Sequence, residues 1–424
     1  MAGRLDLVPW EEARERVIHA VSELAPVPVP VAEAHGLTLA TGVRAEEAMP
    51  PFANSAMDGF AVLAADVAGA SRNEPVVLEV VGELPAGRSV SNPVTPGKAV
   101  RVMTGAPIPE GADAVVPVEA TNFWDPHTRA GRVPETAEEG RVLRISRPAT
   151  AGAHIRAAGE SVRAGEEFLE SGHRIRGAEI ALLLSVGVKL VNVHPLPRVG
   201  VLSTGDELVE PDATPGPGQI RDSNRIGLLR RIEEFGFPGV DLGLVRDDPG
   251  ALASRILESL PRIDFLLTSG GVSVGDYDFT RRVLAELGAV EAYRVAVKPG
   301  KPQVFGNIGG MPVFGLPGNP VSSMVVFDQF VHPGLRRMAG RLPLRPPVFT
   351  ATLEASLTRS PGRTEFLRVR LEPEDGAWVA RTAGPQGSGV LSSMTKANGY
   401  AIIPPEVETI AGGDPVPCQL MRWD

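Results

Sequence analysis

Strands and helices alternate between residues 181 and 338, and this alternation limits the fold more than any other feature of the sequence. The segments "RVGVLSTGDEL", "IDFLLTS" and "MPVFGLPGNP" read as strands, and the second is an apolar run of the kind that is buried on both faces of a sheet. The segments "SNRIGLLRRIEEFG" and "DFTRRVLAELG" read as helices. Such alternation predicts a parallel, doubly wound α/β sheet, which binds ligands beyond the carboxyl ends of its strands.

The sequence on both sides of this region has other patterns. Short β-type runs cut by glycine and proline turns fill residues 46–147. Near the C-terminus, "TEFLRVRLEPEDGAWVARTA" predicts a hairpin, because Asp-Gly is a favoured two-residue turn. Near the start, five apolar residues recur at helical spacing and predict an amphipathic helix over residues 8–24. These five are Trp10, Ala13, Val17, Val21 and Leu24.

We therefore expect a multidomain chain of the class α/β plus β, with a doubly wound α/β domain, small β domains and an N-terminal helical segment. The expected divisions are a discontinuous N-terminal helical and linker domain (1–45 and 148–180), a small β domain (46–147), the α/β domain (181–338) and a C-terminal β domain (339–424).

Composition excludes several classes of function. The formal net charge of −9 argues against a broad nucleic-acid-binding surface. The one cysteine, Cys418, cannot form an intrachain disulfide or a cysteine-rich zinc site. No apolar run approaches the roughly 18 residues of a membrane span, and the N-terminus lacks the apolar core of a signal peptide. We expect a soluble cytoplasmic protein whose partners include neither nucleic acid nor membrane.

Three polar, glycine-containing loops follow predicted strands, at residues 203–208, 268–276 and 315–320. On a parallel sheet all three lie at the same rim. The middle loop offers backbone amides to a phosphate, because its glycines allow close approach and the next helix adds its own amide donors. The sequence contains neither GxGxxG nor a Walker motif, which argues against a nicotinamide enzyme or a P-loop NTPase. The candidate binding residues of the middle loop are Ser269, Gly270, Gly271, Ser273 and Gly275.

Two acids, Asp276 and Asp278, stand beside this glycine loop. Two bare charges about 5 Å apart repel by roughly 3 kcal/mol at an effective dielectric constant of ~20, so a cation is expected between them. Mg²⁺ suits one or two carboxylates together with phosphate oxygens. Glu207 and Asp247 are candidates to complete the metal site. The alternative is that Asp278 caps a helix and Asp276 occupies a turn.

Basic residues gather in "YRVAVKPGKPQVFG", where prolines stiffen one turn. Arg294, Lys298 and Lys301 are there, and compact lysine charges suit a small, strongly hydrated oxyanion. The alternative is a solvated surface turn. Asp58 in "NSAMDGFAV" and Thr104 in "VMTGAPIP" are polar candidates in the small β domain, although each segment also reads as a tight turn.

Six ordered motifs together resemble the molybdopterin molybdenumtransferases, that is, the MoeA proteins and the E domain of gephyrin. They are "NSAMDGFAV", "MTGAPIPEGADAVV", "STGDEL", "TSGGVSVGDYD", "KPGKP" and "GLPGNPVSS". The resemblance implies that molybdate is inserted into adenylylated molybdopterin (molybdopterin-AMP) with release of AMP and with help from Mg²⁺. It also implies four subdomains and an elongated homodimer, with a cleft between the α/β domain of one subunit and the small β domain of the other. Other cofactor-biosynthesis proteins are candidate partners.

The resemblance also assigns candidate roles to residues. It implies polar and acidic site groups at Asp58, Thr104, Glu207, Asp247 and Asp278, oxyanion binders at Lys298 and Lys301, and further site candidates at Ser322, Arg368 and Ser393. Three positions depart from the family pattern. Ser161 replaces an acid, Arg294 stands where some members have lysine, and Ala53 replaces a frequent aspartate.

Three alternatives remain. A molybdopterin adenylyltransferase has a similar α/β domain and TSGG-type loop, but it usually lacks the additional β domains. A scaffold role, as in gephyrin, is disfavoured because the sequence has no second α/β domain and no long low-complexity linker. A relative that uses tungstate is not separable from one that uses molybdate, since the two ions are nearly isosteric.

Overall fold

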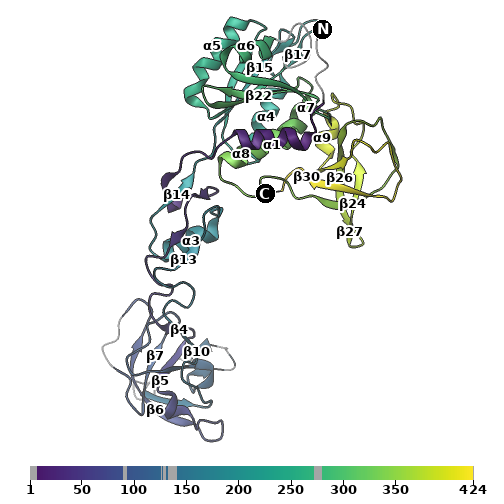
Figure 1. The fold of residues 1–424 in the computed structure, drawn as a ribbon. Helices are drawn as coiled ribbons and strands as arrows, with labels where there is room; N and C mark the ends of the chain where they lie inside the picture. Colours follow the sequence, from purple (N-terminus) through teal and green to yellow (C-terminus); the bar gives the residue numbers. More distant parts are fainter. Residues whose placement is uncertain are drawn as a thin grey trace.

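The chain forms an elongated molecule with a large body at one end, a narrow arm and a small tip (Figure 1). The structure is a computed structural model that describes residues 7–88, 93–125, 127, 130–131, 141–271 and 279–423. We call residues 7–24 and 199–423 the body, residues 27–49 and 162–194 the arm, and residues 54–156 the tip. Of the helices in the described ranges, none has the length and apolar character that crossing a membrane requires.

The centre of the body is a six-stranded sheet with helices on both faces. Four neighbouring strands are parallel, as predicted. The strand of residues 302–308 runs antiparallel to them because a hairpin turn at Gly309 and Gly310 joins it to its neighbour, and the edge strand of residues 289–294 pairs antiparallel with that strand. Helices α4 (Ser223–Glu234) and α7 (Pro320–Val326) cover one face, and α5 (Pro249–Ser259) and α6 (Phe279–Leu287) cover the other. In order, the strands are β18 (Gly239–Val245), β15 (Val199–Thr204), β19 (Phe265–Ser269), β23 (Met311–Leu316), β22 (Pro302–Ile308) and β20 (Ala289–Arg294).

The N-terminal helix α1 (Trp10–Ala20) belongs to the body. Its apolar face is buried as predicted, and the Trp10 ring meets Phe366 of the C-terminal sheet edge-on, with ring centroids 5.0 Å apart. Glu11 and Glu12 in its first turn suit the positive end of the helix dipole. The structure therefore divides residues 1–45 differently from the expected domain, because α1 packs with the α/β core and only the residues after it enter the arm.

The arm is built from two passes of the chain. Strand β14 (Leu190–His194) pairs antiparallel with β1 (Val27–Pro30) and β2 (Thr38–Leu39), and β13 (Glu167–Leu169) pairs with β3 (Val43–Arg44). Helix α3 (Gly177–Ser185) buries Leu183 in the core of the arm beside Val193. The α/β domain consequently begins at β15, later than the expected residue 181.

The tip is a small β domain, as predicted for this stretch. Its five-stranded sheet has the order β11 (Val142–Ile145), β6 (Val76–Leu84), β7 (Lys98–Val102), β5 (Gly59–Val62) and β8 (Ala114–Pro117). The shorter elements are β4 (Asn54–Ser55), β9 (Trp124–Asp125), β10 (Ala130–Gly131), β12 (Ile155–Arg156) and α2 (Ala64–Val67).

A second six-stranded sheet forms the C-terminal part of the body. The predicted hairpin is confirmed, with Asp375 and Gly376 both at positive φ (47° and 82°) between its strands, as a type I′ turn requires. In order, the strands are β21 (Val297–Lys298), β26 (Thr364–Glu374), β27 (Ala377–Thr382), β24 (Phe349–Leu353), β30 (Pro415–Leu420) and β28 (Gly399–Ile403). The remaining short elements of the body are α8 (His332–Met338), α9 (Ser392–Lys396), β16 (Leu208–Val209), β17 (Ile220–Arg221), β25 (Leu357–Thr358) and β29 (Thr409–Ile410).

A buried ionic network joins the two sheets of the body. Asp328, in a π-helical turn between α7 and α8, accepts two hydrogen bonds from Arg231 of α4, at 3.0 and 2.8 Å, and one from the Tyr400 hydroxyl of β28, at 2.8 Å. Burial lowers the pKa of Arg231, but Asp328, Tyr400 and Glu234 together outweigh burial and raise that pKa. Three distant segments are thereby held together by one carboxylate.

We predict that Asp328→Asn lowers the free energy of unfolding by about 3–5 kcal/mol, because it removes the buried counter-ion of Arg231 and leaves only the more exposed Glu234. Glu234→Gln is the matched control, since Glu234 also pairs with Arg231 but its side chain is 46% exposed. The control should cost less than about 1 kcal/mol. Urea unfolding followed by tryptophan fluorescence measures both, and equal midpoints for the two variants would contradict the prediction.

Candidate active site

The three predicted strand-end loops meet at one rim of the body sheet. They follow β15, β19 and β23, which are adjacent parallel strands. The Gly270 N–H donates to the Leu316 carbonyl at 3.2 Å. The side-chain amide of Asn224, in α4, donates to Ser269 Oγ of the middle loop at 3.0 Å and to the Gly318 carbonyl of the third loop at 2.7 Å. The prediction of a common rim is confirmed, and Asn224 is a rim residue that the sequence analysis missed.

Glycine is required in the middle loop because other segments pack against its backbone. Gly270 and Gly271 have φ values of 96° and 63°. A Cβ on Gly270 would lie 2.7 Å from the Thr204 carbonyl oxygen, and one on Gly271 would lie 2.1 Å from Thr280 Oγ1. The rest of the loop, with the predicted residues Ser273, Gly275, Asp276 and Asp278, lies outside the described residues.

The predicted acids Glu207 and Asp247 lie near each other at this rim, together with Asp206. The Asp247 N–H donates to Asp206 Oδ1 at 3.3 Å. Burial raises the pKa of Asp247 and outweighs a backbone hydrogen bond with Asp206 that lowers it, and the charges of the Asp206 and Glu207 carboxylates raise it further. Asp206 was missed by the sequence analysis, although it is adjacent to Glu207 in "STGDEL".

The carboxylates of these three acids repel one another and offer oxygen ligands, which suits a hard cation such as Mg²⁺. This ion needs only one or two carboxylates from the protein. Among the described residues, no group of three or more histidine, cysteine, aspartate or glutamate side chains is arranged to hold a metal.

The basic turn at residues 298–301 lies between the α/β domain and the C-terminal sheet. Lys298 Nζ is 2.9 Å from Oε1 of Glu365, a buried residue of β26 that also faces Arg359 at 3.1 Å. A Cβ on Gly300 would lie 3.7 Å from the Ser322 carbonyl oxygen, so the turn adjoins the start of α7. Lys301 and Arg294 are half-buried on the same segment. The sequence analysis missed Glu365, for which the only sequence signal was an acidic residue within a predicted strand that is otherwise largely apolar.

Arg368 and Ser393 lie together but face inward. The Arg368 guanidinium donates to Ser393 Oγ and to the Gly387 carbonyl, each at 3.2 Å, and both Arg368 and Ser393 have no exposed surface. Burial lowers the pKa of Arg368. Asn319 stands at the N-cap position of α7, but its side-chain amide donates to Ser388 Oγ at 3.1 Å. These contacts order the 387–393 segment beside α7.

Asp58 and Thr104 meet at the tip. The Thr104 N–H and hydroxyl both donate to Asp58 Oδ1 at 2.7 Å, and these bonds lower the pKa of Asp58. Within one chain, the arm separates this pair from the rim of the body sheet (Figure 1). One subunit therefore does not bring all of the predicted polar groups together.

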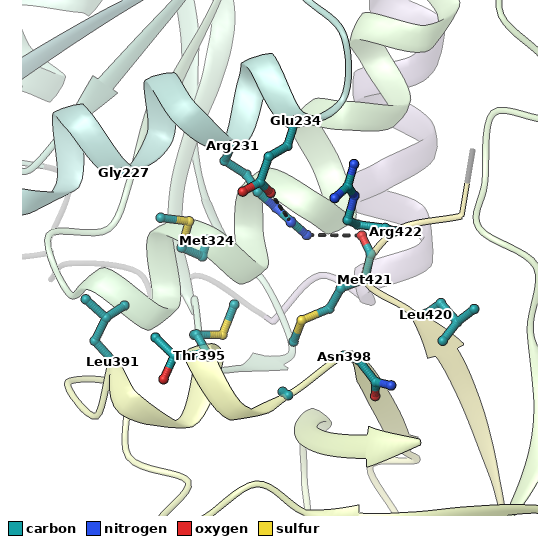
Figure 2. Close-up of a pocket in the computed structure, with 12 residues that line it drawn as sticks. Gly227, Arg231, Glu234, Met324, Leu391, Thr395, Asn398, Leu420, Met421 and Arg422 are labelled. Carbon is teal, nitrogen blue, oxygen red and sulfur yellow. Dashed lines mark hydrogen bonds and ion pairs between the residues drawn. The ribbon is translucent and has the colours of Figure 1, made fainter. Parts of the chain in front are cut away.

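A cavity of about 510 Å³ opens between α4, α7 and α9 (Figure 2). Its lining includes Met324, Met394 and Met421, and the Arg231 guanidinium at its edge is bound to Glu234 and to the Met421 carbonyl. None of the predicted site residues lines it. Its apolar lining does not suit a doubly charged oxyanion.

Comparison with known proteins covers nearly the whole chain. Residues 8–187 match the MoeA N-terminal region (domains I and II), residues 200–337 match a probable molybdopterin binding domain, and residues 350–421 match the MoeA C-terminal region (domain IV). The chain is 37% identical to molybdopterin molybdenumtransferase 2 of Mycobacterium tuberculosis, over 98% of each chain. The chain belongs to the MoeA family.

Other members agree with this assignment. A molybdopterin molybdenumtransferase of Nostoc is 36% identical over 90% of this chain and 86% of its own length. The crystal structure of the molybdopterin biosynthesis MoeA protein of Pyrococcus horikoshii superposes with a TM-score of 0.79 at 31% identity, covering 98% of this chain and all of that one. Residues 188–199 lie between the first two matched regions and contain β14, the last strand of the arm. The matched regions therefore divide the arm from the α/β domain at the same place as the structure does.

We predict that Asp206→Asn raises the melting temperature by about 1–2 °C at pH 7 in buffer with a chelator, because it removes a charge that repels Asp247. A raised folded-state pKa means that the ionised Asp247 destabilises the fold above that pKa and that this cost disappears as pH falls through it. The difference should therefore vanish near pH 3. Asp212→Asn, at an exposed aspartate of the same domain, is the control. Thermal scans at both pH values test this, and equal effects of the two variants at pH 7 would contradict it.

Proposed function

We propose that this chain transfers molybdenum from molybdate to adenylylated molybdopterin and releases AMP. Membership of the MoeA family supports the transferase class, and relatives that align over nearly the full chain are named molybdopterin molybdenumtransferases. The observation that carries the proposal is the convergence of a glycine loop, acids and an adjoining basic turn around the carboxyl ends of neighbouring strands.

In this proposal the glycine loop holds the phosphate end of the substrate. Ser269 ends β19 at the rim, Gly270 and Gly271 open the glycine loop, and α6 starts directly after that loop. Glu207 and Asp247 would hold Mg²⁺, with Asp276 and Asp278 as further ligands by their place in the sequence. The ion would neutralise charge on the pyrophosphate while AMP departs.

The molybdate end is assigned to the basic turn. Lys298 is held by the buried Glu365, which fixes the direction of its half-exposed side chain. Lys301 and the start of α7 at Ser322 add positive charge and amide donors, because a helix N-terminus attracts anions. Arg368 and Ser393 are buried in this structure, so we assign them to ordering the 387–393 segment around the oxyanion rather than to open coordination.

We further propose that the active cleft forms between two subunits of a homodimer. Asp58 and Thr104 sit at the tip, at the far end of the arm from Glu207 in the same chain (Figure 1). Large apolar side chains are exposed on the arm and on the adjoining body, as expected of a surface that a second copy covers. They are Leu184, Leu190, Leu342 and Val348, each 53–69% exposed.

Cytoplasmic location and contact with other cofactor-biosynthesis proteins are part of the same proposal. The adenylyltransferase alternative is disfavoured, because the family match includes the tip and the C-terminal domain as well as the α/β domain. Preference for molybdate over tungstate is decided by the assay below.

We predict that the protein releases AMP from adenylylated molybdopterin only when molybdate and Mg²⁺ are both present. Lys298→Ala should weaken molybdate binding by about 10–150-fold, as expected for loss of one charge-assisted hydrogen bond of roughly 1.5–3 kcal/mol. Binding of the adenylylated pterin should change little, because it depends on the glycine loop. Chromatography of AMP and calorimetric titration with each substrate measure these effects.

The control for this assay is Lys189→Ala, at an exposed lysine of the arm. Equal molybdate affinity in both lysine variants, with weaker pterin binding in Lys298→Ala, would reassign the turn to the phosphate end. Absence of AMP release by the wild-type protein would exclude the proposed reaction. A parallel titration with tungstate tests the alternative substrate.

We predict that mixing two inactive variants, Asp58→Asn and Glu207→Gln, restores activity if the cleft is shared. In the heterodimer, one cleft combines the intact tip of one chain with the intact body of the other. The mixed dimer should therefore reach about half the wild-type rate, since one of its two clefts is intact. Heterodimers are verified by native mass spectrometry. Verified heterodimers that stay inactive would show that each chain holds its own complete site.

A further inference from the structure

The cavity between α4, α7 and α9 lies on the boundary between the two domains of the body (Figure 2). Helices α4 and α7 of the α/β domain form one wall, and α9 with the end of β30 forms the other. Its volume of about 510 Å³ is typical of small-molecule sites, which are often found between domains. None of the side chains that we assign to the substrates or to the metal lines it. The proposed reaction therefore leaves this cavity without a role.

Large apolar side chains make up most of the lining. Three of them are methionines, whose unbranched, polarisable thioethers adapt to the shape of a ligand and make favourable contacts with aromatic rings. The lining therefore suits a flat aromatic ring better than a sugar or a phosphate. These side chains are Met324, Met394, Met421, Leu391 and Leu420.

A glycine in the middle of α4 keeps part of this space open. Gly227 lines the cavity, although glycine is less favourable than alanine in the interior of a helix. A Cβ at this position would lie 2.9 Å from Cε of Met324. An alanine would therefore displace the end of the Met324 side chain and take up part of the space that both residues line.

Four polar side chains of the lining already have partners within the protein. The Asn398 amide donates to the Leu371 carbonyl at 2.8 Å and accepts from the Leu371 N–H at 2.6 Å. The Thr395 hydroxyl donates to a backbone carbonyl of α9 at 3.0 Å. Arg231 and Glu234 form an ion pair with each other at 2.8 Å. None of the four is needed to recognise a ligand, so the walls select for apolar groups.

Arg422 is the exception among the polar side chains of the lining. It is exposed at the edge of the cavity, next to Met421 (Figure 2). Among the residues that the structure describes, no carboxylate forms an ion pair with it. A guanidinium group binds a carboxylate through two parallel hydrogen bonds. The cavity thus combines an apolar interior with one available cation at its edge.

We propose that this cavity binds a small aromatic carboxylate, with its ring among the methionines and its carboxylate group at Arg422. The apolar walls account for the ring, and the single available cation accounts for the single negative charge. Such a ligand contacts both domains of the body and stabilises their observed relative position. This binding site is additional to the proposed transferase site and does not depend on it.

The test uses two probes that share one carbon skeleton, cinnamate and the uncharged cinnamyl alcohol, in calorimetric titrations of the full chain. Wild-type protein should bind one molecule of either probe per chain, and cinnamate more tightly. Arg422→Gln should weaken cinnamate binding by about 10-fold, the lower end of the loss expected for a charge-assisted hydrogen bond, because Arg422 is exposed to solvent. Binding of cinnamyl alcohol should not change. Arg163→Gln, at an exposed arginine of the arm, is the matched control and should bind both probes as the wild type does.

Gly227→Ala tests the position of the ring. It should weaken the binding of both probes, because the displaced Met324 side chain occupies part of the cavity. Its melting temperature without ligand should be no lower than that of the wild type, since alanine is the better helix former. Cinnamate should raise the melting temperature of the wild type, because a ligand that binds only the folded state stabilises it, and should raise that of Gly227→Ala less.

Three outcomes would overturn the proposal. The first is the absence of saturable cinnamate binding by the wild type. The second is equal cinnamate affinity in Arg422→Gln and Arg163→Gln, and the third is unchanged binding of both probes in Gly227→Ala. Circular dichroism establishes that each variant is folded. Failure of AMP release would leave these titrations unaffected, so the two proposals are tested separately.

Discussion

The buried carboxylate of Asp328 is the interaction on which the arrangement of the body depends. It binds the Arg231 guanidinium through two hydrogen bonds and accepts a third from Tyr400, which has no exposed surface. The same guanidinium donates to the Met421 carbonyl near the end of the chain. A charge taken out of water is costly unless it is fully paired, so the helices and the C-terminal sheet have one favourable relative position. Within the C-terminal sheet, Lys298 of β21 lies opposite Glu365 of β26 and pairs with it at 2.9 Å.

The elongated shape of the molecule is the second constraint, because it determines which polar residues can meet within one chain. A body, a narrow arm and a small tip place two groups of polar residues at opposite ends of one chain (Figure 1). Asp58 and Thr104 form a tight hydrogen-bonded pair at the tip, whereas the acids and the glycine loop lie on the rim of the body sheet. The proposed homodimer would bring both groups into one cleft, and the exposed apolar residues of the arm support that proposal.

The net charge of −9 conceals a strong separation of charge. Acids crowd the rim of the body sheet, where Asp206 and Glu207 raise the pKa of Asp247, while arginines crowd the junction of arm and body, where Arg174 lowers the pKa of Arg336 and Arg341 beyond the effect of burial. Like charges therefore gather at two separate places in the molecule.

The sequence by itself determined the elements whose signals are local. The buried run at β19, the apolar face of α1 and the Asp375-Gly376 turn each follow from neighbouring residues, because side-chain period and permitted φ values are properties of a few consecutive positions. The meeting of the strand-end loops also followed, since parallel strands place their carboxyl ends together. The partner of Lys298, the inward turn of Arg368 and the convergence of Arg174 with Arg336 were decided only by the tertiary structure. Those contacts join segments far apart in the chain, and their geometry is set by how whole sheets and helices pack, which no short stretch of sequence specifies.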